Sequence, residues 1–538
     1  MFSGINSKVI LALFLTFVVG ILFLVQPKSK NQLMSTLWES QIEQVGVGSP
    51  RLADVNNDQV LDIIIGSGFE WAEKGESAMN AIDGVSGEII WRTTVPESPY
   101  GTPVLIDITG DGIVDTTASG RFTDFYMLDG KNGEIIWKLS EQNPTVTMLP
   151  CNFNSPTPVA DIDGDGHRDI VVIQGGLANN TREITISDLE TNEIIVDLYN
   201  KGNIQQILQE LVNNSSNDVF KFKICQGNNC EPRTISRDTI LYYSYDTLMT
   251  KIFLNQEGPG GMVYLISSLN GNILSSFPVP FDRESWSVPI YFVHNGSHRI
   301  IYGSGGERKD GFFFSQDIIT GQLHWSVKIP NKGAISSPLL IRENNRSFVI
   351  SNTMNGDIFK LDAISGDVVW QATVGKEYES YSSVAMIQLK GKPYRDVVSV
   401  FSRGIWPQYD SASLFIFDGV SGQRIFQKKT GFCNGASSPL IGDIDNDQLD
   451  DIILLTCTDR QPRLLVVSND LKDIVSEPLS SGAYATPAIK DIDQDGFLDI
   501  IISRYHYINR LTLDSKYNVN YKNSWSEYRG SNWTGVSD

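Results

Sequence analysis

The chain has 538 residues, of which 41% are hydrophobic and 20% are charged, values that are ordinary for a folded globular protein with a large core. Its formal net charge is −20 at pH 7, and no stripe of Lys and Arg runs along the sequence. A nucleic acid is therefore excluded as a partner, because binding to its backbone depends on clustered positive charge.

The first element is an uncharged apolar run, Val9 to Val25, which approaches the roughly 20 residues that a helix needs to cross a hydrocarbon layer. A cleaved signal has a shorter apolar region with small residues at the cut, whereas this run ends in Gln26-Pro27-Lys28-Ser29-Lys30. We therefore expect residues 1–30 to form a short N-terminus and a single transmembrane signal-anchor helix, with secretion after signal cleavage as the alternative. The rest of the chain is expected outside the cytoplasm, at the cell surface, in a secretory lumen or in a periplasm.

A unit of about fifty residues, a length typical of propeller blades, then recurs along the chain. Its first half is clearest at Thr157–Val172, where an apolar strand, an acidic turn and a second apolar strand follow one another. Its second half is clearest at Leu128–Trp137, a hairpin whose Asp-Gly and Gly supply the positive φ angles of a tight turn. The same hairpin recurs at Asp83–Trp91, Asp317–Trp325, Asp362–Trp370 and Asp418–Phe426. Four strands per unit predict an all-β fold, a single β-propeller of about eight four-stranded blades, although seven or nine also fit.

The propeller is expected to span residues 49–520, followed by a C-terminal tail at 521–538. Trp38 precedes the first acidic turn much as Trp91 precedes the second. A closing strand within 31–48 is therefore expected to complete the last blade, which would remove an open sheet edge.

An insertion at about 198–261 departs from the repeat and carries the apolar spacing of a helix around Ile204 to Val212. Both a partner-binding role and a solvent-side excursion fit it. The five cysteines are too few for a disulfide scaffold and contain no Cys-x-x-Cys pair. Cys225 and Cys230 close a short loop and could pair.

Five acidic turns carry oxygen-bearing side chains at positions one, three, five and nine. In chain order these residues are Asp54, Asn56, Asp58, Asp62; Asp107, Thr109, Asp111, Asp115; Asp161, Asp163, Asp165, Asp169; Asp443, Asp445, Asp447, Asp451; and Asp491, Asp493, Asp495, Asp499. Calcium prefers six to eight hard oxygen ligands, and a backbone carbonyl and water can complete such a shell. The alternative is an ordinary turn, for which Asp, Asn and Gly are also favoured.

The five turns differ in how well they suit calcium. The third and the fifth have three leading Asp residues and a Gly at position six, whereas the first and fourth have Gln there and Thr109 weakens the second. An EF-hand is excluded, because no Glu stands at position twelve and strands flank the turns.

These motifs allow a resemblance to be stated. The acidic turns with their strands resemble FG-GAP repeats of integrin-α-type propellers, and the Asp-Gly-x-x-Gly-x-x-x-Trp hairpins resemble the tryptophan-docking repeats of quinoprotein (PQQ-like) propellers. Together they cover about Trp38 to Asn520, and Trp525–Gly530 also resembles a segment of PQQ-like repeat proteins. The resemblance implies a β-propeller with Ca²⁺ in the acidic turns and adhesion or ligand binding as its role.

No catalytic constellation stands out, so the sequence predicts that the chain is not an enzyme. The cysteine pair with which quinoprotein dehydrogenases hold their cofactor has no counterpart, and no Gly-x-Ser-x-Gly or HExxH motif occurs. His294 and His298 favour a solvated turn over a ligand pair.

The expected function is that of a membrane-anchored, calcium-binding scaffold for an unidentified protein or glycan. A quinone-cofactor oxidoreductase, a propeller hydrolase and an envelope or membrane-protein assembly factor are the alternatives.

Overall fold

The computed structural model describes most of the chain from Met34 onward. The described residues are 34–43, 48–68, 77–96, 98–120, 124–143, 153–175, 184–188, 194–197, 219–226, 229–236, 260–306, 310–405, 408–431, 437–444, 447–458, 461–479, 485–504, 506–513, 526–530 and 534–537. Within them no helix has the length and apolarity to cross a membrane. The anchor predicted at 9–25 lies outside the described residues, as do Cys151, Cys433 and the helix predicted around 204–212.

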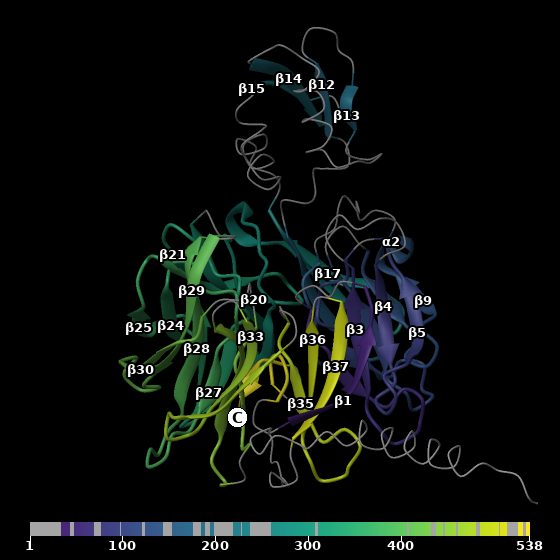
Figure 1. The fold of residues 1–538 in the computed structure, drawn as a ribbon. Helices are drawn as coiled ribbons and strands as arrows, with labels where there is room; N and C mark the ends of the chain where they lie inside the picture. The colour runs from purple at the N-terminus through teal and green to yellow at the C-terminus, as the bar shows by residue number, and fades with distance from the viewer. Residues whose placement is uncertain are drawn as a thin grey trace, which may run out of the picture.

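The described strands form nine sheets, and eight of these are propeller blades, as the repeat predicts (Figure 1). Blade 1 holds β2 (Arg51–Ala53), β3 (Asp62–Ser67), β4 (Ala78–Ile82) and β5 (Ile89–Thr94), and blade 2 holds β6 (Leu105–Ile106), β7 (Asp115–Ala118), β8 (Tyr126–Leu128) and β9 (Ile135–Lys138). Blade 3 holds β10 (Thr157–Pro158), β11 (Ile170–Gln174), β16 (Met262–Ile266) and β17 (Ile273–Pro278), and blade 4 holds β18 (Ile290–His294), β19 (Ser297–Gly303), β20 (Gly311–Asp317) and β21 (Leu323–Ile329).

The remaining blades repeat this order. Blade 5 holds β22 (Leu339–Glu343), β23 (Arg346–Asn352), β24 (Asp357–Asp362) and β25 (Val368–Thr373), with β38 (Val536–Ser537) added beside β22. Blade 6 holds β26 (Tyr378–Glu379), β27 (Ala385–Ile387), β28 (Asp396–Ile405), β29 (Gln408–Phe417) and β30 (Arg424–Lys429), and blade 7 holds β31 (Leu440–Gly442), β32 (Asp451–Thr458), β33 (Gln461–Val467) and β34 (Asp473–Pro478). Blade 8 holds β35 (Ala488–Lys490), β36 (Asp499–Arg504) and β37 (Tyr507–Leu513), and β1 (Met34–Gln41) is its outer strand. The short α2 (Leu139–Gln142) and the 3₁₀ turn η2 (Pro280–Asp282) lie between blades.

The ring is closed by the two ends of the repeat array, because β1 pairs antiparallel with β37 from Met34 to Gln41. Adjacent strands of a blade run antiparallel, so its first and third connections meet at one face of the ring and its middle connection lies at the other. The acidic turns and the Asp-x-x-x-Gly hairpins therefore share one face of the propeller.

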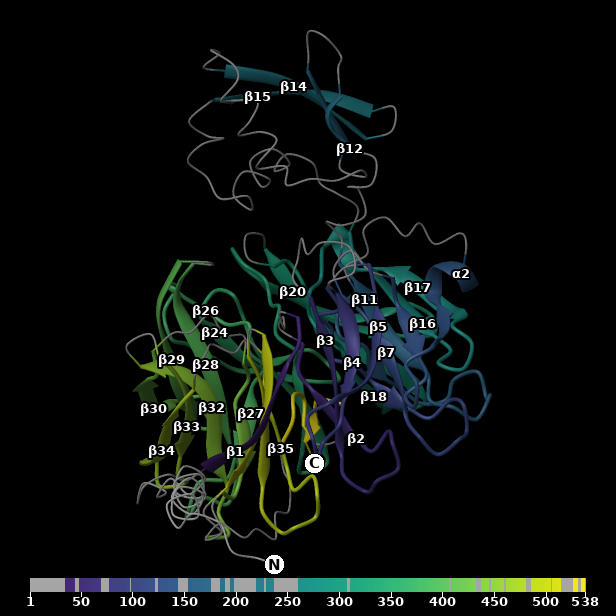
Figure 2. The same ribbon diagram turned by 45° about the vertical axis from the view of Figure 1, so that its right-hand side comes forward.

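The ninth sheet stands apart from the ring in both ribbon views (Figures 1 and 2). It consists of β12 (Ile184–Asp188), β13 (Ile194–Asp197), β14 (Val219–Gln226) and β15 (Asn229–Ser236). These strands lie between β11 and β16 of blade 3, so the sheet is an insertion in that blade's middle connection, on the face opposite the acidic turns. Cys225 and Cys230 are paired residues in the β14–β15 strand register.

Five of the eight blades are joined to the next through a tryptophan of the hairpin repeat. Trp91, 7% exposed, lies on the outer strand of blade 1 and donates its indole N–H to Gly130 O of blade 2 at 2.7 Å. Its ring covers Gly133, which has a φ of +75°; a Cβ added to this residue would meet the ring at 2.7 Å, so only glycine fits there. Trp38, Trp137, Trp325 and Trp370 make the same bond to the following blade.

A row of hydroxyl groups links the inner strands. The N–H of Ser383 binds Ser438 Oγ, the N–H of Ser438 binds Thr486 Oγ1, and the N–H of Thr486 binds Ser49 Oγ, at 2.9 to 3.1 Å. The N–H of Ser49 then binds Thr102 Oγ1 at 3.0 Å. These residues each precede the inner strand of a blade, so five successive blades, including the closing joint, are connected in one line.

The C-terminal tail lies against the same inner strands. Glu527 accepts a bond from Arg51 of blade 1 at 3.2 Å, while Arg529 donates to Thr157 Oγ1 at 2.9 Å and to Pro289 O at 2.6 Å. Leu340 of blade 5 donates to Gly535 O at 2.8 Å. The tail therefore contacts blades on several sides of the ring and stabilises them together.

We predict that Trp91→Ala lowers the free energy of unfolding by about 3–5 kcal/mol, because it removes a buried aromatic ring and leaves the Gly130 carbonyl without its donor. The measurement is urea unfolding of the variant beside Val85→Ala, which truncates a side chain that is 57% exposed. Equal stability of the two variants would contradict the docking role of the indole.

Candidate metal centre

The five acidic turns share one hydrogen-bond pattern, which the third turn illustrates. Asp161 Oδ2 accepts the N–H of Gly166 at 2.9 Å, and Asp165 Oδ1 accepts the N–H of His167 at 2.8 Å. The other four turns repeat both bonds at the same positions. The residue at position six has a positive φ, which is +95° at Gly166 and favours glycine. The first and fifth positions thus shape the turn through their own carboxylates.

The ninth-position aspartates are buried, each at most 1% exposed, and each ties its turn to the second strand of the blade. These residues are Asp62, Asp115, Asp169, Asp451 and Asp499. In all five, Oδ2 accepts the N–H of position two at 2.7 to 3.2 Å. The ninth position is therefore a structural clamp in every turn.

In three turns the second oxygen of the clamp is also satisfied by the backbone. Asp62 Oδ1 accepts the N–H of Gly84 at 2.9 Å, and Asp115 Oδ1 accepts that of Gly130 at 3.0 Å. Asp451 Oδ1 accepts the N–H of Asn469 at 3.2 Å. The donors belong to the neighbouring hairpin, so these carboxylates join the two halves of the repeat and are poorly placed to serve a cation as well.

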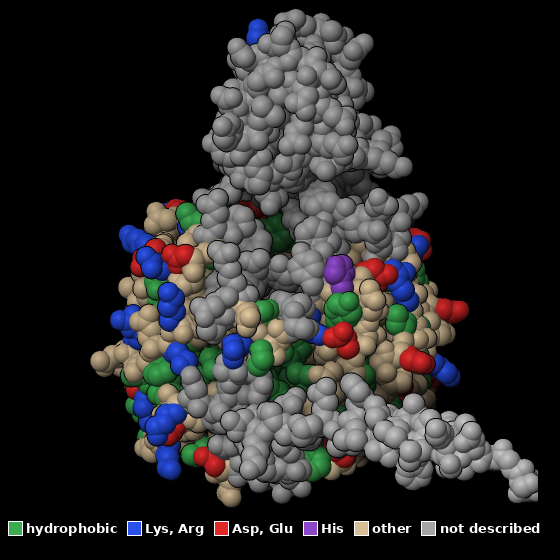
Figure 3. All heavy atoms as spheres, in the orientation of Figure 1, with side chains coloured by type: hydrophobic (Ala, Val, Ile, Leu, Met, Phe, Trp, Pro, Cys, Tyr) green, Lys and Arg blue, Asp and Glu red, His purple; other side chains and the backbone are tan. Residues whose placement is uncertain are grey.

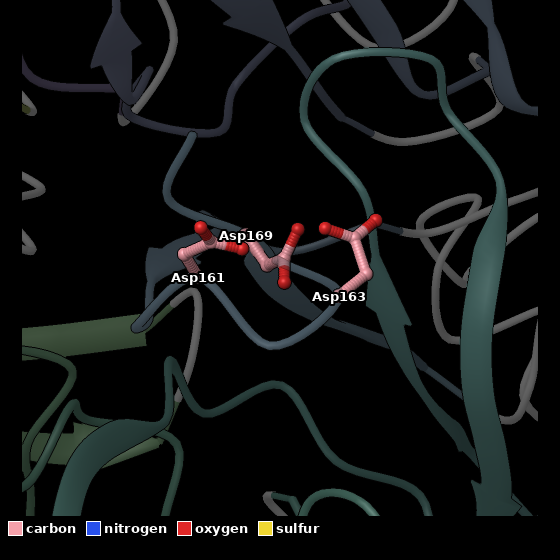
Figure 4. A group of neighbouring side chains, drawn as sticks. All are labelled: Asp161, Asp163 and Asp169. Carbon is pink, nitrogen blue, oxygen red and sulfur yellow. The ribbon is translucent and has the colours of Figure 1, made fainter. Parts of the chain in front are cut away.

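In the third turn, as in the fifth, the clamp is satisfied on one oxygen only. Asp169 is fully buried, and its Oδ1 has no hydrogen-bond partner. Oxygens of Asp161, Asp163 and Asp169 all lie within 4.8 Å of one another, and Figure 4 shows the Asp169 carboxylate between the other two. Burial raises the pKa of Asp169 to about 6; the Ile162 N–H opposes the rise, and the charges of Asp163 and Asp165 add to it.

These features fit a calcium ion. A buried carboxylate oxygen without a donor is costly, and close carboxylates repel one another unless a cation or protons neutralise them. Asp161, Asp163 and Asp169 would hold the ion, which would neutralise their charge and satisfy Asp169 Oδ1.

The fifth turn places the same residue types together but already contains a cation. Oxygens of Asp491, Asp493 and Asp499 also lie within 4.8 Å of one another. The guanidinium of Arg510, whose side chain is 4% exposed, bridges Asp493 and Asp499, at 2.9 Å from Asp499. Burial raises the pKa of Asp499, and Arg510 opposes that rise.

Blade 6 carries a second internal cation at the same face. Its first connection contains Lys392, whose Nζ donates to Asp396 Oδ1 at 2.8 Å and to Asp418 Oδ2 at 3.1 Å. Asp396 corresponds to the ninth-position clamp, because its Oδ1 also accepts the N–H of a hairpin glycine, Gly419. An ammonium group therefore lies beside the clamp of a blade that lacks the acidic sequence.

The structure thus brings together three carboxylates in the third and fifth turns, the two that the sequence ranks highest. Among the described residues it forms no such group in the first, second or fourth turn, and Asp445 of the fourth turn lies outside them. No sequence pattern points to Arg510, which belongs to a later strand. On the face seen in Figure 3, the described Lys, Arg, Asp and Glu side chains are interspersed.

Three side chains outside the acidic turns, those of His294, His298 and Tyr409, have structural partners. His298 Nδ1 lies 2.7 Å from the Tyr291 hydroxyl, and the Tyr409 hydroxyl donates to Glu379 at 2.5 Å. His294 Nε2 lies 3.2 Å from Asn295 Nδ2.

We predict a pH dependence that isolates the clamp of the first turn. Burial raises the pKa of Asp62 to about 6, although the N–H groups of Val55 and Gly84 lower it. The stability contributed by the protonated form is fully present below the unfolded pKa of about 3.9 and is lost as the pH rises through about 6.

Asp62→Asn removes this titration. The difference in unfolding free energy, wild type minus variant, should fall by about 2 kcal/mol between pH 4 and pH 7, measured by urea unfolding in chelator. A difference that stays constant or rises with pH would be inconsistent with a clamp buried in this way.

No protein-family model and no curated protein matches the sequence. Among solved structures, the chain is similar to the quinohemoprotein alcohol dehydrogenase ADHIIG from Pseudomonas putida HK5, with 10% identity, a TM-score of 0.48, and coverage of 89% of this chain and 76% of that one. It is also similar to a europium-containing methanol dehydrogenase, with 10% identity, a TM-score of 0.47, and coverage of 89% and 93%. BamB from Moraxella catarrhalis is 12% identical, with a TM-score of 0.38 and coverage of 82% and 98%.

The similar structures bear on two expectations from the sequence: that the chain is not an enzyme, and that it resembles two repeat families. The prediction that the chain is not an enzyme was wrong as an exclusion, since two of these similar structures are dehydrogenases. The PQQ-like part of the sequence resemblance fits the propeller and its docked tryptophans, whereas the FG-GAP part is not shown by the comparisons.

Proposed function

We propose that the chain is a calcium-stabilised β-propeller that serves as a binding scaffold outside the cytoplasm, held to a membrane by residues 9–25. The observation that carries the cation part is the buried Asp169 Oδ1, which has no partner and belongs to a group of three carboxylates. A cation in the third turn is favoured over a solvent-filled acidic turn, because only a cation or a proton relieves both the repulsion and the lost hydrogen bond.

The third turn is also well placed for a stabilising ion. Asp161 opens the turn after β10, Asp169 closes it before β11, and Asp165 accepts a bond from Ser267 of the following hairpin at 3.1 Å. An ion held by the first and last residues would fix both inner strands of blade 3. The long insertion leaves from the other end of β11, so the ion would stiffen the blade that carries it.

The binding role is supported by the position of the separate β12–β15 sheet. It belongs to the middle connection of blade 3, on the face away from the acidic turns, and long connections on a rigid scaffold commonly carry binding residues. The proposed partner is a protein or a glycan, as expected from the sequence.

We predict that calcium raises the melting temperature of the full chain and that Asp161→Asn abolishes the rise. Calcium at one hundred times its dissociation constant should add about 2.7 kcal/mol. The matched control is Asp107→Asn, since Asp107 accepts the corresponding bond, from Gly112 at 3.0 Å, in the second turn.

Both variants weaken the turn itself, so the control should melt earlier than wild type yet keep the calcium response. Differential scanning calorimetry in chelator and in calcium measures both effects. The cation role is refuted if wild type melts at the same temperature in both conditions.

A further inference from the structure

We infer that Arg510 is a built-in cation that fills the fifth acidic turn, so that the third turn takes a divalent cation and the fifth does not. This inference rests on the proposed function, because it assigns the calcium site to one of two turns that look alike in sequence. Both have Asp at positions one, three, five and nine and Gly at position six.

The two turns place their carboxylates alike. In each, three aspartates have oxygens within 4.8 Å of one another, and Oδ1 of the ninth-position residue has no hydrogen-bond partner. Asp161 and Asp491 also accept equivalent backbone bonds, from Gly166 at 2.9 Å and from Gly496 at 3.0 Å. The carboxylates alone therefore give no reason for the turns to differ.

The difference lies on the third strand of the blade. In blade 8, Arg510 pairs with Ile501, two residues after the ninth-position Asp499. In blade 3, the residue that pairs with Val171, two residues after Asp169, is Leu265. Leu265 is 1% exposed and apolar, so the third turn has no internal cation at the place from which Arg510 reaches the fifth.

Arg510 is firmly fixed in that place. One terminal nitrogen contacts both Asp493 and Asp499, and the other donates to Gly84 O of blade 1 at 3.0 Å. The side chain is 4% exposed, so leaving the turn would require a buried guanidinium to give up its charged partners. A calcium ion would compete with this bound charge and would repel it.

Two other blades use a fixed cation in a similar way. Lys360 of blade 5 stands at the register position of Arg510, since it pairs with Ile350 and donates to the hairpin carbonyl of Gly419, and its charge is neutralised by Glu343 at 2.7 Å. Lys392 of blade 6 lies against a clamp aspartate. Blades 5 and 6 thus also hold a lysine ammonium group in contact with the hairpin or the clamp.

The experiment counts calcium ions bound by the detergent-solubilised full chain, using equilibrium dialysis against radioactive calcium on the folded, monodisperse fraction. Arg510→Leu gives blade 8 the residue type that Leu265 provides at the same position in blade 3, and it should raise the number of bound calcium ions by one. Arg510→Lys keeps the cation and should leave the count unchanged, while Arg510→Leu combined with Asp491→Asn should return it to the wild-type value.

A second comparison leaves Arg510 in place, so it holds even if the leucine variant folds poorly. In the wild-type background, Asp161→Asn should lower the count by one and Asp491→Asn should not change it. A lower count in Asp491→Asn, or an unchanged count in folded Arg510→Leu, would overturn the assignment of Arg510. An unchanged count in Asp161→Asn would instead refute the proposed calcium site in the third turn.

Discussion

In blades 1, 2 and 6 one hairpin glycine connects the two halves of the repeat and receives the tryptophan of the preceding blade, and the joints of the propeller depend on this residue. In blade 2 the N–H of Gly130 binds the buried carboxylate of Asp115, while its carbonyl accepts the indole N–H of Trp91 from blade 1. Gly84 does the same with Asp62 and Trp38. The acidic turn therefore holds the hairpin, the hairpin holds the tryptophan of the preceding blade, and the ring is assembled from these local joints.

This joint explains why the ninth-position aspartate recurs even where a metal site is incomplete. A buried carboxylate is expensive unless its oxygens are hydrogen-bonded, and in blades 1, 2 and 7 the backbone supplies those bonds. Blade 8 adds the guanidinium of Arg510 and blade 6 the ammonium of Lys392. Blade 3 has neither a second backbone donor nor a cation for Asp169, which singles out its turn for an external ion.

Much of the fold follows from the sequence because its signals are local. The Asp-Gly hairpins and their tryptophans lie within ten residues of each other, so the repeat predicts eight blades and their docking. The outcome for the acidic turns depends on a residue of another strand: Arg510 is eleven residues beyond Asp499, and its effect comes from the strand register, which spacing alone does not reveal. The inner hydroxyl row is visible as recurring Ser-Pro and Thr-Pro steps, but its bonds join blades about fifty residues apart.

The sequence is least informative where the repeat is interrupted. Asp188 ends β12 in the separate sheet, where pairing with β13 and β14 replaces a place in the ring. The absence of known catalytic motifs was also a poor reason to exclude an enzyme. Such motifs identify particular enzyme families and say little about a propeller outside those families.

The most direct test of the third turn as the cation site is anomalous diffraction from crystals of the protein soaked in terbium, which replaces calcium at oxygen sites. We predict an anomalous peak in contact with Asp161, Asp163 and Asp169, and none beside Arg510 in the fifth turn. A peak between Asp493 and Asp499, or no peak in the third turn, would contradict it.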